Sequence, residues 1–206
     1  MKKPLLLFSL LIFGLSSVMA QGKWELKKNE DGIEVFTRKP AKGNLKELRV
    51  VCELEATKTQ LINELQNIGD YNSWVYANKK SEIIKMINQQ TIIYYAQSRL
   101  PWPIKDRDLI IQLTISPTPE VLVIQAKSLP DYLPKQNDYV RVPYSLAVWK
   151  VIQAPNNKLK VDYTFSVDPG GSIPSWLVNA TITVGPYNSF FKLRDILRAQ
   201  KQPVIN

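Results

Sequence analysis

The chain has 206 residues, a formal net charge of +9, one cysteine and no histidine. A single cysteine excludes a disulfide bond within the chain, and the lack of histidine removes the commonest ligand of a transition-metal site and the base of a serine hydrolase. The basic residues are scattered among acidic ones and form no basic stripe, so nucleic acid is not expected as a partner.

The start of the chain has the layout of a secretory signal peptide. Two lysines precede an uncharged run over residues 4–18, and Ala20 provides a small residue at the cleavage position. The run is shorter than the ~20 apolar residues of a transmembrane helix, which disfavours the alternative of a retained membrane anchor. We therefore expect a signal peptide at residues 1–20, one domain at residues 21–206, and export to the periplasm or the cell exterior.

Two strands are expected next. Residues 33–38 form a short strand after a turn, and residues 45–55 alternate between apolar and polar positions. Cys52 lies on the apolar side of the second strand, which favours a buried small side chain over a reactive thiol.

A helix is expected to follow, with Thr57 as its N-cap and Gly69 at its end. Its spacing of apolar residues predicts one buried stripe. That stripe contains Leu61, Ile62 and Leu65. An aromatic segment over residues 71–76 comes after the helix.

Five further strands are expected in succession. They cover residues 81–87, 91–100, 108–116, 121–128 and 139–153. A turn at Asn156-Asn157 leads to a last strand over residues 159–167, in which apolar and polar side chains alternate. Such alternation is typical of antiparallel sheets with one buried face, and short turns between successive strands favour antiparallel pairing.

The chain is expected to end in a long helix from Ile173 to about Gln200. Ser172 serves as its N-cap, and Pro174 lies in the first turn, where the missing N–H donor is harmless. Apolar residues recur at spacings of three and four, at Ile173, Leu177, Ala180, Val184, Tyr187 and Phe191. Gly185-Pro186 interrupts this stripe and predicts a kink or a break.

These elements predict an α+β fold in which a curved antiparallel sheet wraps around the long C-terminal helix. A strongly curved sheet and one helix need not touch everywhere, and a gap between their buried faces would be apolar. The alternative is an interaction module with a filled core and no cavity.

Five segments along the chain carry motifs that resemble one known family. Residues 168–179 read D-P-G-G-S-I-P-S-W-L-V-N, and residues 102–108 read W-P-I-K-D-R-D. The other three are Trp24 with residues 31–35, Trp74, and residues 139–141. In this order, over residues 23–198, they resemble START domains, the lipid-transfer domains related to the steroidogenic acute regulatory protein.

The resemblance implies a helix-grip fold, in which the sheet curls around the C-terminal helix and leaves a tunnel for one lipid such as a sterol, a phospholipid or a ceramide. It implies non-covalent binding and transfer, with no catalytic residue, cofactor or metal ion. We expect a monomer that binds a lipid or sterol-like molecule and touches membrane surfaces transiently. The alternative function is a cyclase-like enzyme of the helix-grip superfamily that acts on a bound hydrophobic substrate.

Arg107 and Asp108 are adjacent on an expected strand, so that one of them faces the apolar interior. A buried charge needs a partner, which Arg141, Asp162 or a ligand head group could provide. Two interpretations stay open. One is a polar contact that orients the ligand in the tunnel, and the other is a structural ion pair without ligand contact.

Large aromatic side chains provide broad apolar walls with a polar tip, although ordinary core packing is the alternative for each of them. Under the tunnel hypothesis, Ala180 and the Val184 region leave room for the ligand, and Phe191 closes one end. The expected ligand contacts are Trp74, Tyr95, Arg107, Arg141, Trp149, Tyr163, Trp176, Leu177, Ala180, Val184, Tyr187 and Phe191.

Overall fold

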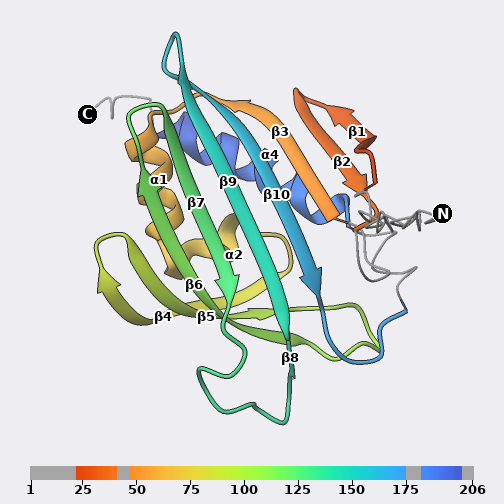
Figure 1. Cartoon of the computed structure of the whole chain (residues 1–206). Coiled ribbons are helices and arrows are strands. Elements are labelled where there is room, and N and C mark those ends of the chain that lie inside the picture. The colour runs from red at the N-terminus through yellow and green to blue at the C-terminus, as the bar shows by residue number, and fades with distance from the viewer. Residues whose placement is uncertain (1–21, 41–46, 175–181, 201–206) are drawn as a thin grey trace, which may run out of the picture.

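Alternating apolar and polar residues build one sheet of ten strands, shown in Figure 1. The structure, a computed structural model, describes residues 22–40, 47–174 and 182–200. The strands are β1 (Glu25–Glu30), β2 (Ile33–Arg38), β3 (Glu47–Leu54), β4 (Asn78–Asn88), β5 (Thr91–Ser98), β6 (Arg107–Pro117), β7 (Val121–Ser128), β8 (Val140–Arg141), β9 (Tyr144–Ala154) and β10 (Lys158–Asp168).

The strands run in the order β1-β2-β3-β10-β9-β7-β6-β5-β4, and every pair of neighbours in this order is antiparallel. The two-residue strand β8 pairs with β6 in parallel, off this path. The prediction of an α+β fold with an antiparallel sheet is confirmed.

The helices lie on one side of this sheet (Figure 1). They are α1 (Lys58–Gln66), the short 3₁₀ helix η1 (Ile68–Asp70), α2 (Tyr71–Trp74) and α4 (Val184–Ala199). The C-terminal helix α4 contacts β2, β3 and α2, so it closes the space between the sheet and the α1–α2 segment. Among the described helices, none has both the length and the hydrophobicity that a membrane-spanning helix requires.

The expected strands and helix before the long sheet are present, but the helix does not end at Gly69: α1 stops at Gln66, and Gly69 lies inside η1. The strand at residues 33–38 has the predicted bounds, and β3 covers residues 47–54 of the strand expected at 45–55. Cys52 is buried, and this burial raises the pKa of its thiol to about 12. Thr57 forms a complete capping box with Gln60, in which each side chain bonds the backbone N–H of the other residue.

The strand expected at residues 139–153 is two strands, because Pro143 interrupts it between β8 and β9. Proline has no N–H for a sheet and is tolerated only where pairing stops. The hairpin predicted at Asn156-Asn157 is confirmed. Both residues have a left-handed backbone, with φ of 59° and 52°, in the three-residue loop that joins Ala154 to its partner Lys158.

The terminal helix begins later than the sequence predicts. Ile173 and Pro174 are not helical, and α4 starts at Val184. Gly185 and Pro186 therefore lie in the first turn of α4, where backbone N–H groups have no partner within the helix. Inside α4 the expected kink does not arise, because a proline in the first turn removes no helical hydrogen bond. The predicted break depends on residues 175–181, which lie outside the described residues. The predicted site residues Trp176, Leu177 and Ala180 lie outside the described residues.

The late start also changes which face of the helix is buried. Phe190, Leu193 and Leu197 are buried, whereas Val184 on the predicted stripe is 45% exposed. The predicted apolar stripe assumes one continuous helix from Ile173 to Gln200. Because the described chain is not helical at Ile173, the period of 3.6 residues has to be counted from Val184.

Candidate functional site

A cavity of about 330 Å³ lies between the sheet and the helices α2 and α4. Its walls come from six neighbouring strands, β4, β5, β6, β7, β9 and β10, and its cover comes from α2, the residues after it and the first turns of α4. The alternative of a filled core is therefore wrong. A void of this size holds far more than a few water molecules.

Small side chains on the sheet create this space. Ala96, Ala126 and Ala147 line the cavity from β5, β7 and β9, and Ala126 stands directly opposite Ala147 in the sheet. A methyl group does not reach across the distance that separates a sheet from the helices over it, so the surface opposite these alanines stays uncovered.

Aromatic rings form the wall at one side of the alanines. The ring centroids of Trp149 and Tyr163, on the adjacent strands β9 and β10, lie 4.8 Å apart in an edge-to-face arrangement. Phe190 of α4 packs against both, at 4.9 Å from Trp149 and 5.2 Å from Tyr163. This contact joins the terminal helix to the sheet and is worth about 0.5–1.5 kcal/mol per ring pair beyond burial.

A second aromatic group forms another part of the wall. Tyr71 packs edge-to-face on Trp74 and on Tyr94, with centroids 5.1 Å and 5.6 Å apart. The hydroxyl of Tyr71 donates a hydrogen bond to the carbonyl oxygen of Leu65 at 2.6 Å. Burial raises the pKa of Tyr71, Tyr94 and Tyr163, so all three phenols are neutral at physiological pH.

Several polar atoms of the wall have no hydrogen-bond partner among the described residues. They include the indole Nε1 of Trp74 and the amide Oδ1 of Asn78, both buried. The hydroxyls of Tyr94 and Tyr163 also have none within the described part of the chain, whereas Tyr71 has one. Buried polar groups are normally paired, so these atoms mark where a bound molecule would gain hydrogen bonds.

The cover of the cavity is held by a short chain of hydrogen bonds. The backbone N–H of Tyr76 donates to the hydroxyl of Ser189 at 2.9 Å, and this hydroxyl donates to the carbonyl of Gly185 at 3.0 Å. A Cβ on Gly185 would lie 3.0 Å from the ring of Tyr76, so a larger residue here would require this ring to shift by a few tenths of an ångström. Tyr76 and the start of α4 therefore meet directly over the cavity.

Arg141, one of the two charged residues predicted for the site, forms an ion pair away from the cavity lining. Arg141 binds both carboxylate oxygens of Asp108, at 3.0 Å and 2.8 Å, and both side chains are buried. The expectation that Arg141 is a partner of the buried charge is confirmed. The geometry is that of the structural ion pair, one of the two interpretations left open by the sequence.

Arg107 is buried and binds backbone carbonyls in place of an acidic side chain. It donates to Lys105, to Pro169 at 3.3 Å and to Gly170 at 2.9 Å. These bonds fasten the segment after β10 to the start of β6. Burial lowers the pKa of Arg107, but the guanidinium stays charged at physiological pH.

The cavity brings together Trp74, Trp149 and Tyr163 of the predicted contacts. Tyr95 packs on the opposite face of β5 with Ile93 and Ile110, because adjacent residues of a strand point to opposite sides. Arg107 and Arg141 are held by their own partners, as described. Tyr95, Arg107 and Arg141 are therefore not among the described residues that line the cavity.

The predicted helix residues also lie elsewhere. The Tyr187 hydroxyl donates to Asp31 at 2.6 Å, a bond that raises the pKa of Tyr187 to about 12. Phe191 packs beside Tyr187 and under the guanidinium of Arg194, and Val184 is partly exposed. The shifted start of α4 turns these side chains away from the cavity lining.

Sequence reasoning missed Tyr71, Phe190 and the three alanines as cavity residues. The aromatic run at residues 71–76 was a usable signal for Tyr71. The signal for the alanines was weaker: each is a small residue at an inward position of a strand that carries larger apolar residues on the same face. Phe190 required the true start of α4.

Comparisons with known proteins agree with this geometry. An uncharacterised protein of Pseudomonas aeruginosa is 28% identical over 89% of this chain and 91% of its own length. The human phosphatidylcholine transfer protein is 25% identical over 88% of the chain and 85% of its own length.

A solved structure of a STAR-related lipid transfer protein from Xanthomonas axonopodis is 29% identical. It superposes with a TM-score of 0.79 and covers 85% of this chain and 98% of that one. The family model of the START domain matches residues 17–203, nearly the whole sequence. The chain therefore belongs to the START domain family.

Proposed function

We propose that this START domain binds one lipid or sterol-like molecule non-covalently in the cavity and transfers it between membranes. The observation that carries the proposal is the apolar cavity of about 330 Å³ under α4. The relatives support it, because two of them are named for lipid transfer. These names also favour a carrier over a cyclase-like enzyme.

Apolar burial provides the driving force. Hiding about 400 Å² of ligand surface would contribute on the order of 10 kcal/mol at about 25 cal/mol per Å². Loss of ligand and side-chain freedom opposes this by several kcal/mol, which leaves room for micromolar affinity or better. We propose Trp74, Trp149 and Tyr163 as ligand contacts, since they line the cavity. Contacts by Trp176, Leu177 and Ala180 stay predictions.

The test is extraction of the purified protein with organic solvent, followed by mass spectrometry of the extract. Ala147→Phe places a ring in the cavity from β9 and should remove the bound lipid. Ala199→Phe, at the exposed end of α4, is the matched control and should keep it. A wild-type extract without lipid, together with failure to take up added lipid, would contradict the proposal.

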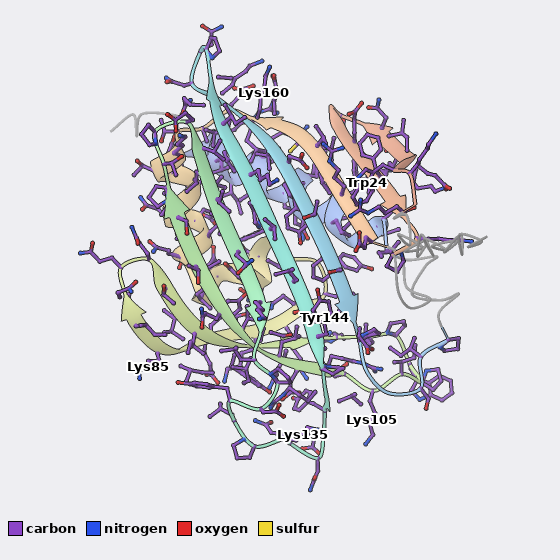
Figure 2. The ribbon with its side chains drawn as sticks, in the orientation of Figure 1. Trp24, Lys85, Lys105, Lys135, Tyr144 and Lys160 are labelled. Atoms are coloured by element: carbon purple, nitrogen blue, oxygen red, sulfur yellow. The ribbon has the colours of Figure 1, made fainter. Side chains whose placement is uncertain are left out.

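We propose further that the protein loads its ligand at a membrane surface. Trp102, in the loop between β5 and β6, is 92% exposed, and an exposed tryptophan gains energy at a membrane interface. Basic side chains surround this end of the molecule, where Figure 2 shows Lys105 and Lys135. Anionic lipids would attract these charges.

Sedimentation with vesicles of phosphatidylglycerol and phosphatidylcholine tests this contact. Trp102→Ala should reduce binding to the vesicles by about tenfold, the loss expected for one interfacial aromatic side chain. Ile152→Ala is the control, because Ile152 is also exposed but pairs with Lys160 at the opposite end (Figure 2). Equal losses in both variants would contradict a contact through the Trp102 loop.

We propose that residues 1–20 direct export to the periplasm or the cell exterior, on the basis of their signal-peptide layout. Fractionation of cells that express the full chain, with N-terminal sequencing of the product, tests this. The expected product begins at Gln21 and leaves the cytoplasm. A product that keeps its first residues in the cytoplasm would contradict export.

A further inference from the structure

The cavity wall carries no charge among the residues that the structure describes. The sequence from 175 to 181, outside the described residues, has no Asp, Glu, Lys or Arg either. Burying a phosphate or a carboxylate without a charged or strongly hydrogen-bonding partner is very unfavourable. A ligand held in this cavity therefore cannot place an ionised head group there.

The wall nevertheless offers hydrogen bonds from two neutral phenols. Tyr94 on β5 and Tyr163 on β10 both line the cavity. In the sheet they are separated by β6, β7 and β9, and the shape of the sheet brings them to the same space.

Neither hydroxyl has a hydrogen-bond partner among the described residues, although Tyr94 is only 5% exposed. A phenol provides one donor and accepts in return. A purely apolar ligand would displace water from these hydroxyls and leave them unpaired, so a ligand atom that pairs with them is favoured. A neutral ligand group that can accept hydrogen bonds from two phenols is a hydroxyl or a carbonyl oxygen.

We infer that the cavity selects an uncharged lipid whose single polar group, a hydroxyl or a carbonyl, is held by Tyr94 and Tyr163. The inference rests on the proposed carrier function and narrows its ligand. It departs from the head group in the name of the human relative, which carries a phosphate.

The size of the cavity agrees with a small ligand. Its volume of about 330 Å³ is near the lower end of the roughly 300–1,000 Å³ of small-molecule sites. This favours a molecule with one chain or a compact ring system over a lipid with two long acyl chains.

Three probes with the same alkyl chain separate the possible head groups. They are dodecanol, dodecanoate and dodecyl phosphate. Each is added to the purified, lipid-extracted protein, dodecanol below its solubility limit and the two anions below their critical micelle concentrations. Binding is measured by the fluorescence of the cavity tryptophans Trp74 and Trp149. Dodecanol should bind at least about a hundredfold more tightly than either anion, because only the anions must lose their hydration without a charged partner.

The double variant Tyr94→Phe/Tyr163→Phe keeps both rings and removes both hydroxyls. It should weaken dodecanol binding by about tenfold or more, the effect of one or two lost hydrogen bonds, while unfolding at the same temperature or higher. Tyr132→Phe, at a partly exposed tyrosine of the loop after β7, is the matched control and should bind like the wild type.

The inference is wrong if an anion binds as tightly as dodecanol, or if the double variant binds dodecanol like the wild type. It is also wrong if none of the three probes binds although organic extraction recovers a lipid, and the carrier function then stands. If extraction recovers nothing and no lipid or probe binds, the carrier function falls together with the inference.

Discussion

Arg141 shows how one buried charge organises a loop. Besides both oxygens of Asp108, its guanidinium binds the carbonyls of Pro130, Leu133 and Pro134 at 2.8, 3.1 and 3.3 Å. A buried ion pair is costly to break, because removal of one partner leaves the other charged and unsolvated. The pair therefore matters to stability although it does not line the cavity.

We expect Arg141→Met to lower the free energy of unfolding by about 3–5 kcal/mol, since Asp108 would stay buried without a partner. Arg49→Met is the matched control, because Arg49 binds Asp162 with the same two-bond geometry in a half-exposed position. It should cost less than about 1 kcal/mol. Urea denaturation measures both losses, and similar values for the two variants would contradict this account.

Cys52 gives a second test at this scale. Burial raises its thiol pKa from 9.0 to about 12, so the reactive thiolate is rare in the folded protein at pH 8. Iodoacetamide should therefore modify the native chain at least about a hundredfold more slowly than the urea-unfolded chain. Because the folded pKa is the higher one, this thiol also lowers stability as the pH rises from about 9 to 12. Mass spectrometry of a time course measures the rates, and equal rates would show that Cys52 is accessible.

At the scale of secondary structure, the elements are ended and joined by short-range contacts. The first helix begins at the capping box of Thr57 and Gln60. The last helix is tied to the turn between β1 and β2, where Tyr187 and Arg194 both bind Asp31, at 2.6 and 2.7 Å. These contacts fix where each helix lies over the sheet, and so where the cavity is closed.

Thr57→Ala should lower the free energy of unfolding by about 1 kcal/mol, because the N–H of Gln60 loses its acceptor. Thr57→Ser keeps the hydroxyl and should change stability by only a few tenths of a kcal/mol. Thermal unfolding of both variants measures the difference. An equal loss in the serine variant would assign the effect to the methyl group of Thr57 and not to the cap.

At the scale of the whole molecule, the sheet and its helices leave a space that no described side chain fills. An empty cavity forfeits the packing contacts of its lining. A ligand that binds the folded state alone stabilises it by mass action, by about 2.7 kcal/mol at a concentration one hundred times its Kd.

We therefore expect the lipid-extracted protein to unfold at a lower temperature than the protein as purified, and readdition of the recovered lipid to restore the difference. Ala147→Phe should unfold at the same temperature before and after extraction, because its ring excludes the lipid. Differential scanning calorimetry gives these temperatures. An unchanged Tm of the wild-type protein after complete extraction would contradict a lipid bound in the core.

The sequence determined most of the elements by itself. The strand at residues 33–38, the cap at Thr57 and the turn at Asn156-Asn157 depend on neighbouring residues, and local rules describe them well. Alternation in the strands likewise showed that the sheet has one apolar face, and with it the antiparallel α+β fold.

Only the tertiary structure decided the cavity and its walls. Three features depend on elements that are far apart in the chain. They are the pairing of Asp108 with Arg141, the buried face of α4, and the cavity that Tyr94 and Tyr163 both line. The sequence shows which side chains turn inward, but the size of the gap between them depends on how closely the sheet and the last helix approach. That distance is the sum of many packing contacts, and no local pattern contains it.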